Sequence, residues 1–479
     1  MQTADLADLV KKIQTQQCES QTIEVKAAHD GPPTRLFNTI SGFANQDDGG
    51  IIVFGLDEKT RYQVVGVYDP QDLQKKVTEQ CKQMEPTVRP LFAVCTISDR
   101  TVVSAEIPGT DVDQRPVFYK GVGRIKGSYI RVGESDELMS EYEIYSYDAF
   151  RRRIRDDLRQ ISQAKQSFID ENLLNQYLSA VKRDRKHMAD LVSDQDILEL
   201  MGITVAGTLT LAGVMAFSRY PQAYFPQLCI TAVVVPGLSM GDTGEDDERF
   251  IANQRITGPI PDMLEEAVAF VRRNSRVKTI INNEGRRADK PEFPAKAVRE
   301  AILNALMHRD YSIHTESVPV RIVMYSDRME IASSGGLYGH ISIDSLGKVR
   351  PDTRNPTLAN ILEMLAISEN RYSGIPTIRN EFAKAGLPEP IFAIHHGEFV
   401  VTFKNDLLIL RDGSPKKDMN TSILYYCQVP RSRAELVAFT GFSQYYTMAK
   451  LVQPLIDQGK LRMTIPKKPR SRAQRYVRR

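Results

Sequence analysis

The sequence predicts an α+β multidomain fold, and three observations lead to this prediction. Segments that alternate like a strand, such as 23–26, are interspersed with segments of helical periodicity, such as 294–312. A chain of 479 residues is long enough for about three domains. The polar stretch DGSPKKDMN separates a strongly basic C-terminal segment from the rest. We therefore predict domains at 1–148, 149–290, 291–408 and 420–479, with a linker at 409–419.

The composition narrows the class of protein. Apolar residues make up 42% of the chain and charged residues 26%, as in ordinary globular domains. The five cysteines are far apart and form no C-x-x-C pair, so neither a zinc site nor a disulfide framework is indicated. The N-terminus does not read as a signal peptide, and the longest apolar run, 205–217, is too short to span a bilayer. We expect a cytoplasmic protein without membrane contact.

The first domain is expected to alternate helices and strands. The patterns predict a helix at 5–13, a strand at 23–26, a helix at 36–44 and a buried strand at 51–56. Five short motifs follow in order, and a strand-like segment comes after them: Glu19-Ser20, Glu24-Val25-Lys26, Ile40 to Asn45, Gly49-Gly50-Ile51, Phe54 to Asp57, and GSYIRVG at 127–133. This ordered set resembles the Schlafen/AlbA-type DNA-binding domain over residues 15–145.

Two functions are open for that domain. A nucleic-acid-binding module would contact phosphates through basic residues that lie near Tyr119 and Tyr129, namely Lys120, Arg124, Lys126 and Arg131. A nuclease would use acids, and the resemblance to Schlafen endoribonucleases implies a divalent-metal site made of Glu19, Glu24 and Asp57. Glu24 and Lys26 share one face of the expected strand, which a surface salt bridge would explain equally well. A structural or partner-docking role is the third alternative.

The segment 294–312, PAKAVREAILNALMHRDYS, is expected to be a core-facing helix. Its apolar residues recur at helical spacing, and Glu300, Asn304 and His308 stand four apart along the edge of the apolar face. An amide oxygen suits Mg²⁺, and a carboxylate can act on water as a general base. The rim of an ordinary amphipathic helix would show the same pattern.

The residues after this helix extend the interpretation. A strand-like VRIVMYSDRMEIAS at 320–333 and then SGGL follow in order. Together they resemble the GHKL-type ATPase module, in the divergent form found at the C-terminus of RecG-like helicases. The resemblance implies an α/β sandwich that binds ATP and Mg²⁺, with Asn304 as the metal ligand and Glu300 acting on water if ATP is hydrolysed.

The same resemblance assigns two loops. It places Ser333, Gly335 and Gly336 beside the adenine, and Ser373 and Gly374 in the lid motif. The chain departs from its relatives at Ser333, where they commonly carry asparagine, and at Tyr372, where a glycine is expected. No G-x-x-x-x-G-K-[ST] motif occurs, which excludes a P-loop helicase motor. Residues 149–290, with expected strands at 210–217 and 228–235, resemble the segment that precedes this module.

The last sixty residues are expected to form a winged helix. Helices are predicted at 420–426, 432–440 and 443–458, with a hairpin at 461–465 and 475–477. Eight Lys or Arg and no acid occur between 461 and 479. We expect Gln444, Tyr445 and Lys450 to face a nucleic-acid groove. The expected phosphate contacts are Lys467, Lys468, Arg470, Arg472 and Arg475.

These features lead to one main hypothesis and two alternatives. The main hypothesis is a DNA-binding transcriptional regulator, with RNA as an alternative ligand, whose homo-oligomeric assembly or binding is modulated by ATP and Mg²⁺. The first alternative is a metal-dependent Schlafen-like nuclease that serves as a defence effector. The second is an assembly scaffold with a degenerate nucleotide pocket.

Overall fold

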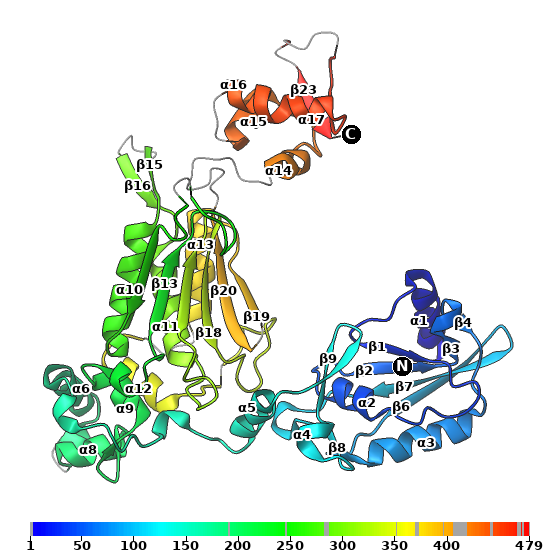
Figure 1. Ribbon diagram of the computed structural model, residues 1–479, viewed down its shortest axis with the longest axis horizontal. Coiled ribbons are helices and arrows are strands. Elements are labelled where there is room, and N and C mark those ends of the chain that lie inside the picture. The colour runs from blue at the N-terminus through cyan, green and yellow to red at the C-terminus, as the bar shows by residue number, and fades with distance from the viewer. Residues whose placement is uncertain are drawn as a thin grey trace. The chain divides into compact units, whose positions relative to one another are not determined.

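The chain folds into two compact units. The computed structural model describes residues 3–189, 192–244, 247–281, 287–350, 352–368, 373–395, 397–405, 419–440, 444–466, 471 and 474–478. The first unit comprises residues 1–156 with the short segments 338–341 and 351–354, and the second unit comprises the remainder (Figure 1). None of the described helices is long and apolar enough to cross a membrane. The predicted α+β multidomain fold is confirmed.

The first unit is built on a four-stranded sheet in the order β1-β2-β7-β6. Its main elements are α1 (Thr3–Gln16), β1 (Ile23–Lys26), α2 (Phe37–Ala44), β2 (Gly50–Phe54), α3 (Pro70–Lys82), β6 (Leu91–Ile97) and β7 (Arg100–Ile107). Strand β1 pairs with β2 in parallel, and the other pairs are antiparallel. Because side chains alternate along a strand, Val53 of β2 packs with α1 while Ile52 and Phe54 pack with α2 and α3. Helices therefore cover both faces of this sheet.

Smaller elements complete the first unit. They are β3 (Leu56–Asp57), β4 (Gln63–Val64), β5 (Met84–Glu85), β8 (Phe118–Tyr119), α4 (Gly123–Gly127), β9 (Tyr129–Val132), β10 (Ser135–Leu138) and α5 (Glu141–Arg151). The hairpin of β9 and β10 packs against α2. A buried network holds it there, since Asn45 donates from Nδ2 to the carbonyl of Tyr129 (3.0 Å) and Ser41 accepts at Oγ from the Tyr129 N–H (2.8 Å).

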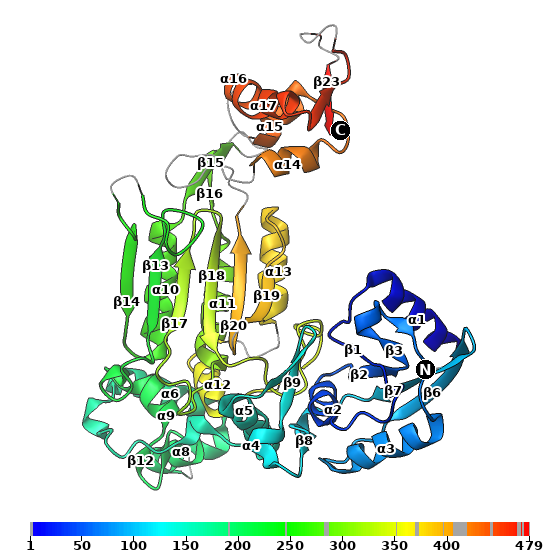
Figure 2. The same cartoon turned by 45° about the vertical axis from the view of Figure 1, so that its right-hand side comes forward.

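The second unit contains a six-stranded sheet in the order β14-β13-β17-β18-β20-β19 (Figure 2). The strands are β13 (Ile230–Val234), β14 (Ala252–Ile256), β17 (Val320–Met324), β18 (Arg328–Ser334), β19 (Ile391–His395) and β20 (Glu398–Lys404). The helices α10 (Ile260–Asn274), α11 (Ala295–His308) and α13 (Gly374–Ala385) form a layer in which α11 contacts both neighbours and β18. The sheet runs across the predicted domain boundary at 290/291, because β13 pairs with both β14 and β17.

The remaining elements of 157–368 are helices and two antiparallel strand pairs, β11–β12 and β15–β16. They are α6 (Glu171–Asp184), α7 (Lys186–Ala189), α8 (Asp194–Leu200), β11 (Thr204–Val205), β12 (Thr208–Leu209), α9 (Leu211–Phe217), β15 (Val277–Ile281), β16 (Arg287–Pro291) and α12 (Pro356–Met364). The strand predicted at 210–217 was wrong, because this segment is the buried helix α9. Its N-cap, Thr210, accepts at Oγ1 from the Gly213 N–H (3.1 Å), and this capping bond favours a helix over an apolar strand.

The C-terminal segment has its own small core. Its elements are α14 (Met419–Tyr426), β21 (Arg431–Ser432), α15 (Arg433–Thr440), α16 (Gln444–Tyr446), a π-helical turn (Thr447–Val452), α17 (Gln453–Asp457), β22 (Leu461–Met463) and β23 (Arg475–Arg478). Buried residues from the helices and from β22 and β23 pack together, among them Ile423, Leu436 and Tyr476. The element order agrees with the predicted helices and hairpin, and the winged-helix assignment stays a prediction.

Candidate functional site

The first candidate site is centred on Arg131 of β9. Strand β1 presents Glu24 on the face of the sheet that α2 covers, because its neighbour Val25 packs on the opposite face under α1. The β9–β10 hairpin brings Arg131 to the same place, where only 3% of the residue is exposed. The Arg131 guanidinium also lies over the Phe43 ring, 5.2 Å from its centroid.

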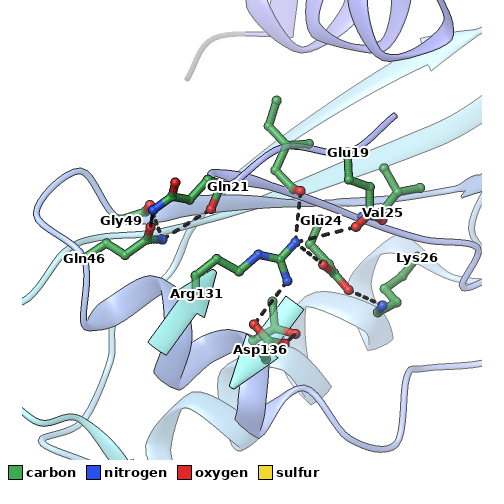
Figure 3. Close-up of polar contacts among 11 residues, drawn as sticks. Glu19, Gln21, Glu24, Val25, Lys26, Gln46, Gly49, Arg131 and Asp136 are labelled. Atoms are coloured by element: carbon green, nitrogen blue, oxygen red, sulfur yellow. Dashed lines mark hydrogen bonds and ion pairs between the residues drawn. The ribbon is translucent and has the colours of Figure 1, made fainter. Parts of the chain in front are cut away.

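Three carboxylates surround this guanidinium (Figure 3). Arg131 Nη2 lies 2.7 Å from Glu24 Oε2 and 3.6 Å from Glu19 Oε2, and Nη1 lies 3.1 Å from Asp136 Oδ1. A guanidinium this deeply buried is stabilised only when charged partners surround it, as they do here. We call Arg131, Glu19, Glu24 and Asp136 the Arg131 cluster.

Further hydrogen bonds fix the carboxylates of the cluster. Glu19 Oε1 accepts from the Val25 N–H (2.8 Å), and Asp136 Oδ2 accepts from Thr39 Oγ1 (2.7 Å). Lys26 donates from Nζ to Glu24, its neighbour on the same face of β1. The shared face of Glu24 and Lys26 was predicted from their alternation, and this prediction is confirmed.

Burial and neighbouring charges separate the pKa values of the two glutamates. The pKa of Glu19 is raised to about 7, because burial and the nearby Glu24 carboxylate together raise it more than the hydrogen bond from the Val25 N–H lowers it. Burial also raises the pKa of Glu24, but its bonds to Lys26 and Arg131 outweigh burial and leave the pKa lowered. Glu19 is therefore the member of this glutamate pair whose charge changes near neutral pH.

The predicted nuclease site does not fit a divalent ion in this arrangement. Glu19 and Glu24 are brought together, but a cation between them would have to displace the Arg131 guanidinium. The Asp57 carboxylate instead accepts from the Lys59 N–H (3.1 Å) and caps the turn that follows β3. Among the described residues, no three His, Cys, Asp or Glu side chains gather as metal ligands.

The four basic residues predicted to contact nucleic acid lie in different surroundings. Arg131 is occupied inside the domain, and Arg124 binds Asp148 (2.8 Å). Lys120 and Lys126 are exposed, and Lys120 forms a surface ion pair with Glu85 (3.1 Å). The solvent-facing basic surface of the first unit thus includes Lys120 and Lys126 and not Arg131.

Asp136 is the member of the Arg131 cluster that sequence reasoning missed. The signal was a two-residue turn at Gly133-Glu134, which places Arg131 opposite Asp136 in the β9–β10 hairpin. Oppositely charged residues that face each other across two strands form a stabilising pair.

The second candidate site lies at α11. Glu300 and Asn304, one helical turn apart, contact each other, since Asn304 Nδ2 donates to Glu300 Oε1 (3.3 Å). This bond uses the amide nitrogen of Asn304, which leaves the amide oxygen as the type of ligand that Mg²⁺ prefers. The arrangement fits a magnesium ion shared with nucleotide phosphates.

The glycine of the lid motif lies directly against this pair. A Cβ atom added at Gly374 would lie 2.3 Å from Glu300 Oε1 and 3.1 Å from Asn304 Nδ2. Gly374 is the first residue of α13, and Ser373 is its N-cap. The structure therefore brings together Glu300, Asn304 and Gly374, which the sequence placed in two separate motifs. We call these three residues the α11 group.

The predicted adenine loop is at the end of β18. Ser333 is buried, pairs with Phe399 of β20, and shares the sheet face of Ile331. Gly335 has φ = 100°, a conformation that requires glycine, and its N–H donates to the Gly397 carbonyl (2.9 Å). A Cβ atom at Gly336 would meet only the Ile394 side chain, at 3.6 Å, so there is more room beside Gly336 than beside Gly374.

Asn355 and Asp310 hold the end of α11. The buried Asn355 donates from Nδ2 to the carbonyls of Met307 (3.0 Å) and Arg309 (2.8 Å), which lie at the helix C-terminus. The Asp310 N–H donates to the Ser334 carbonyl (2.8 Å), which links the end of α11 to the end of β18. These bonds fix the helix that carries Glu300 relative to the adenine loop.

The third set of predicted residues is in the C-terminal segment. Gln444, Tyr445 and Lys450 are exposed, with Tyr445 at 74%. Arg475 Nη1 binds Glu435 Oε2 (3.1 Å). The other predicted phosphate contacts, Lys467, Lys468, Arg470 and Arg472, lie outside the described residues.

Comparison with known proteins identifies two domains. Residues 19–140 match the family "Schlafen, AlbA_2", and residues 318–403 match the family "Putative ATP-dependent DNA helicase recG C-terminal". The chain thus contains a Schlafen/AlbA_2 domain and a RecG-C-like ATPase-type domain, as predicted. No curated protein matches.

Two solved structures show a likeness to this chain, one over most of its length and one over less than a third of it. One is the DIP2311 protein from Corynebacterium diphtheriae, with 17% identity, a TM-score of 0.40, and coverage of 94% of this chain and 92% of that one. The other is the "N-terminal Domain of Putative ATP-dependent DNA Helicase RecG-related Protein from Nitrosomonas europaea", with 27% identity, a TM-score of 0.23, and coverage of 28% and 94%. Because both TM-scores are below 0.5, neither likeness establishes a common fold.

Proposed function

We propose that this protein is a cytoplasmic DNA-binding transcriptional regulator whose assembly or DNA binding is modulated by ATP and Mg²⁺ in the second unit. The observation that carries the proposal is the α11 group, in which Glu300 and Asn304 contact each other and the backbone of Gly374. Helix α11, which carries Glu300 and Asn304, packs against β18 and α13. Both of these elements lie within residues 318–403, which match an ATPase-type family.

Each part of the proposed nucleotide site has a separate task. Asn304 would ligate Mg²⁺ through its amide oxygen, and the ion would neutralise phosphate charge. The N-terminus of α13 at Ser373 and Gly374 would offer backbone N–H groups to the phosphates. Glu300 would orient water if ATP is hydrolysed. Ser333, Gly335 and Gly336 would line the adenine.

The nucleic-acid contacts are proposed for both ends of the chain. The AlbA_2 match of residues 19–140 supports binding by the first unit, where Lys120 and Lys126 are exposed. The basic C-terminal segment supports binding by a winged helix that presents Gln444, Tyr445 and Lys450. Phosphate contacts of this kind give affinity that falls with salt. ATP would act by favouring a homo-oligomeric state that binds DNA with higher avidity.

Calorimetric titration with ATP and Mg²⁺ tests the nucleotide site. We expect saturable binding by the wild type, at least a tenfold weaker affinity for Asn304→Ala, and unchanged affinity for the control Asn175→Ala, since Asn175 is exposed on α6. Absence of binding by the wild type would overturn the nucleotide proposal and favour the scaffold with a degenerate pocket. Equal binding by wild type and Asn304→Ala would remove Asn304 from the site.

Binding to labelled duplex DNA over a range of salt concentrations tests the nucleic-acid role. Lys126→Gln should lower affinity and reduce the slope of log Kobs against log[salt] by about 0.9, the value for one phosphate contact. Arg124→Gln should change the slope less, because its guanidinium binds Asp148. Tighter binding to single-stranded RNA than to DNA would establish the RNA alternative.

The nuclease alternative has a direct test. Incubation with Mg²⁺ or Mn²⁺ and either tRNA or single-stranded DNA should leave the substrate intact, because Arg131 occupies the position between Glu19 and Glu24. Cleavage by the wild type that is lost in Glu24→Gln would overturn the regulator proposal for this domain.

A further inference from the structure

The edge strand β6 differs from the other sheet edges. It pairs with β7 on one side, and within the described ranges it has no strand on the other. Its sequence, LFAVCTI, contains no charged residue over seven positions. An unpaired row of backbone N–H and C=O groups on an uncharged strand readily accepts another strand.

Charged side chains occupy two of the other three edges of the two large sheets. Strand β1 carries Glu24 and Lys26, and β14 carries Arg255, whereas β19 has no charge before His395 at its end. Charges of this kind are a common protection against unwanted strand pairing. Strand β6 has no such charge over its seven residues.

The two faces of β6 have different surroundings. Ala93 and Cys95 are buried in the core that includes α1. On the other face Val94 is 37% exposed and Thr96 is exposed. Leu91, which is 60% exposed, begins the strand on the same face as Ala93 and Cys95. An added strand would therefore extend a packed sheet on one face and cover apolar surface on the other.

We propose that β6 is a self-association site at which a second copy of this chain pairs antiparallel, edge to edge, about a two-fold axis at Val94. In this register Val94 lies opposite its own copy, and Phe92 lies opposite Thr96. The two four-stranded sheets would join into one continuous sheet. A two-fold interface of this kind uses the same residues on both copies.

The residues that flank β6 favour a second copy over another partner. In the same register Arg89 of one copy lies opposite Asp99 of the other, and both residues are exposed. The symmetry makes this pair twice, so the strand is flanked by complementary charges at both ends. Pro90 lacks a backbone N–H, and the chain turns at Ser98-Asp99, where φ is 50° and 61°. These features limit the proposed strand pairing to the residues of β6.

The proposed contact is short, so it predicts a reversible dimer. A single strand pair buries less surface than the roughly 1,200 Å² of a small specific interface, and the dimer should dissociate on dilution. The inference does not depend on the nucleotide site, because none of its residues lies in the second unit.

Sedimentation equilibrium of the full chain without nucleotide tests the proposal. We expect a monomer–dimer equilibrium for the wild type and at least tenfold weaker dimerisation for Val94→Lys, which would set two ammonium groups against each other at the axis. The control Val132→Lys, at a position 51% exposed on β9, should dimerise like the wild type. A monomeric wild type, or equal dimerisation of Val94→Lys, would overturn the proposal. Circular dichroism and thermal unfolding would show that each variant is folded.

Cysteine cross-linking tests the register. In a Cys18→Ser background, which removes the exposed native thiol, Val94→Cys should form a disulfide-linked dimer with oxidised glutathione as the oxidant. Thr96→Cys should not, because its thiol would face Phe92 of the other copy. Arg89→Glu should weaken dimerisation, since it places a glutamate against Asp99. Cross-linking of Thr96→Cys in preference to Val94→Cys would overturn the proposed register.

Discussion

The Arg131 cluster and the α11 group both contain a glutamate that the sequence singled out, and they differ in what faces that glutamate. Glu24 faces a guanidinium from β9, which takes the position of an added cation. Glu300 faces an amide on its own helix and the backbone of a glycine from α13. Acidic residues alone therefore do not define a metal site, because at the first site the chain itself supplies the positive charge beside Glu24.

The largest expected effect comes from removing that internal charge. Arg131→Met would leave Asp136 without its cation and Glu24 with Lys26 alone. Removing one partner of a buried ion pair in this way costs about 3–5 kcal/mol. We expect the free energy of local opening of β1 and β9, measured by hydrogen exchange of the full chain, to fall by this amount. In this variant the position of the guanidinium beside Glu24 would be open to an external cation, so the first site would become similar to a metal site.

A surface ion pair provides the matched control. Lys120 and Glu85 are both exposed, so Lys120→Met should change the same opening free energy by less than about 1 kcal/mol. A change below 1 kcal/mol in Arg131→Met as well would contradict the role assigned to Arg131, since it would mean that water or protonation already satisfies the carboxylates.

The next effect is a pH dependence specific to the first site. Folding raises the pKa of Glu19 from 4.5 to about 7, so the stability that its neutral form contributes is complete below pH 4.5 and is lost as pH rises to about 7. Glu19→Gln stays neutral, and we expect it to lack this loss, which is on the order of 2 kcal/mol. Hydrogen exchange of β1 at several pH values measures it.

The exposed Glu134 serves as the control for this experiment, and Glu134→Gln should keep the pH dependence of the wild type. The lowered pKa of Glu24 acts in the opposite direction and at lower pH, since its contribution is lost as pH falls below its ordinary value. Identical profiles for wild type and Glu19→Gln between pH 4.5 and 7 would show that Glu19 is already charged in the folded protein.

The sequence predicted the order of elements well where periodicity was long or motifs were ordered. The strands around 23–26 and 51–56 were confirmed, and the helix expected at 294–312 is present but ends at His308. Periodicity failed at 210–217, because a short, fully buried apolar run has the same composition in a helix and in a strand. Periodicity also did not predict that β13 and β14 belong to the same sheet as β17 and β18. Pairing between strands that are distant in the sequence depends on tertiary contacts.

The candidate sites show the same limit at the level of side chains. Spacing placed Glu300 beside Asn304 because both lie on one helix, and this contact was confirmed. Spacing could not place Arg131, which sequence reasoning assigned to nucleic acid, because its partners Glu19 and Glu24 lie far away in the chain. Gly374 was predicted as part of a lid, and its approach to Glu300 required the packing of α13 on α11.

The smallest expected effect is a loss of ATP affinity at the second site, and it tests how this site differs from the first. Gly374→Ala adds a methyl group where only a hydrogen fits, 2.3 Å from Glu300 Oε1, so the Glu300–Asn304 contact must shift. The backbone of Gly374 is helical and needs no glycine conformation, so the substitution tests space alone. We expect ATP affinity in the presence of Mg²⁺, measured by calorimetry, to fall about tenfold, which is about 1.4 kcal/mol.

Gly241→Ala is the matched control, because Gly241 is exposed, needs no glycine conformation, and its added Cβ would meet nothing within 4 Å. It should bind ATP within about threefold of the wild type. If Gly374→Ala binds ATP as well as Gly241→Ala does, the close approach of α13 to α11 is structural packing and the nucleotide lies elsewhere. The α11 group would then resemble the Arg131 cluster, in which polar side chains serve the fold and leave no place for a ligand.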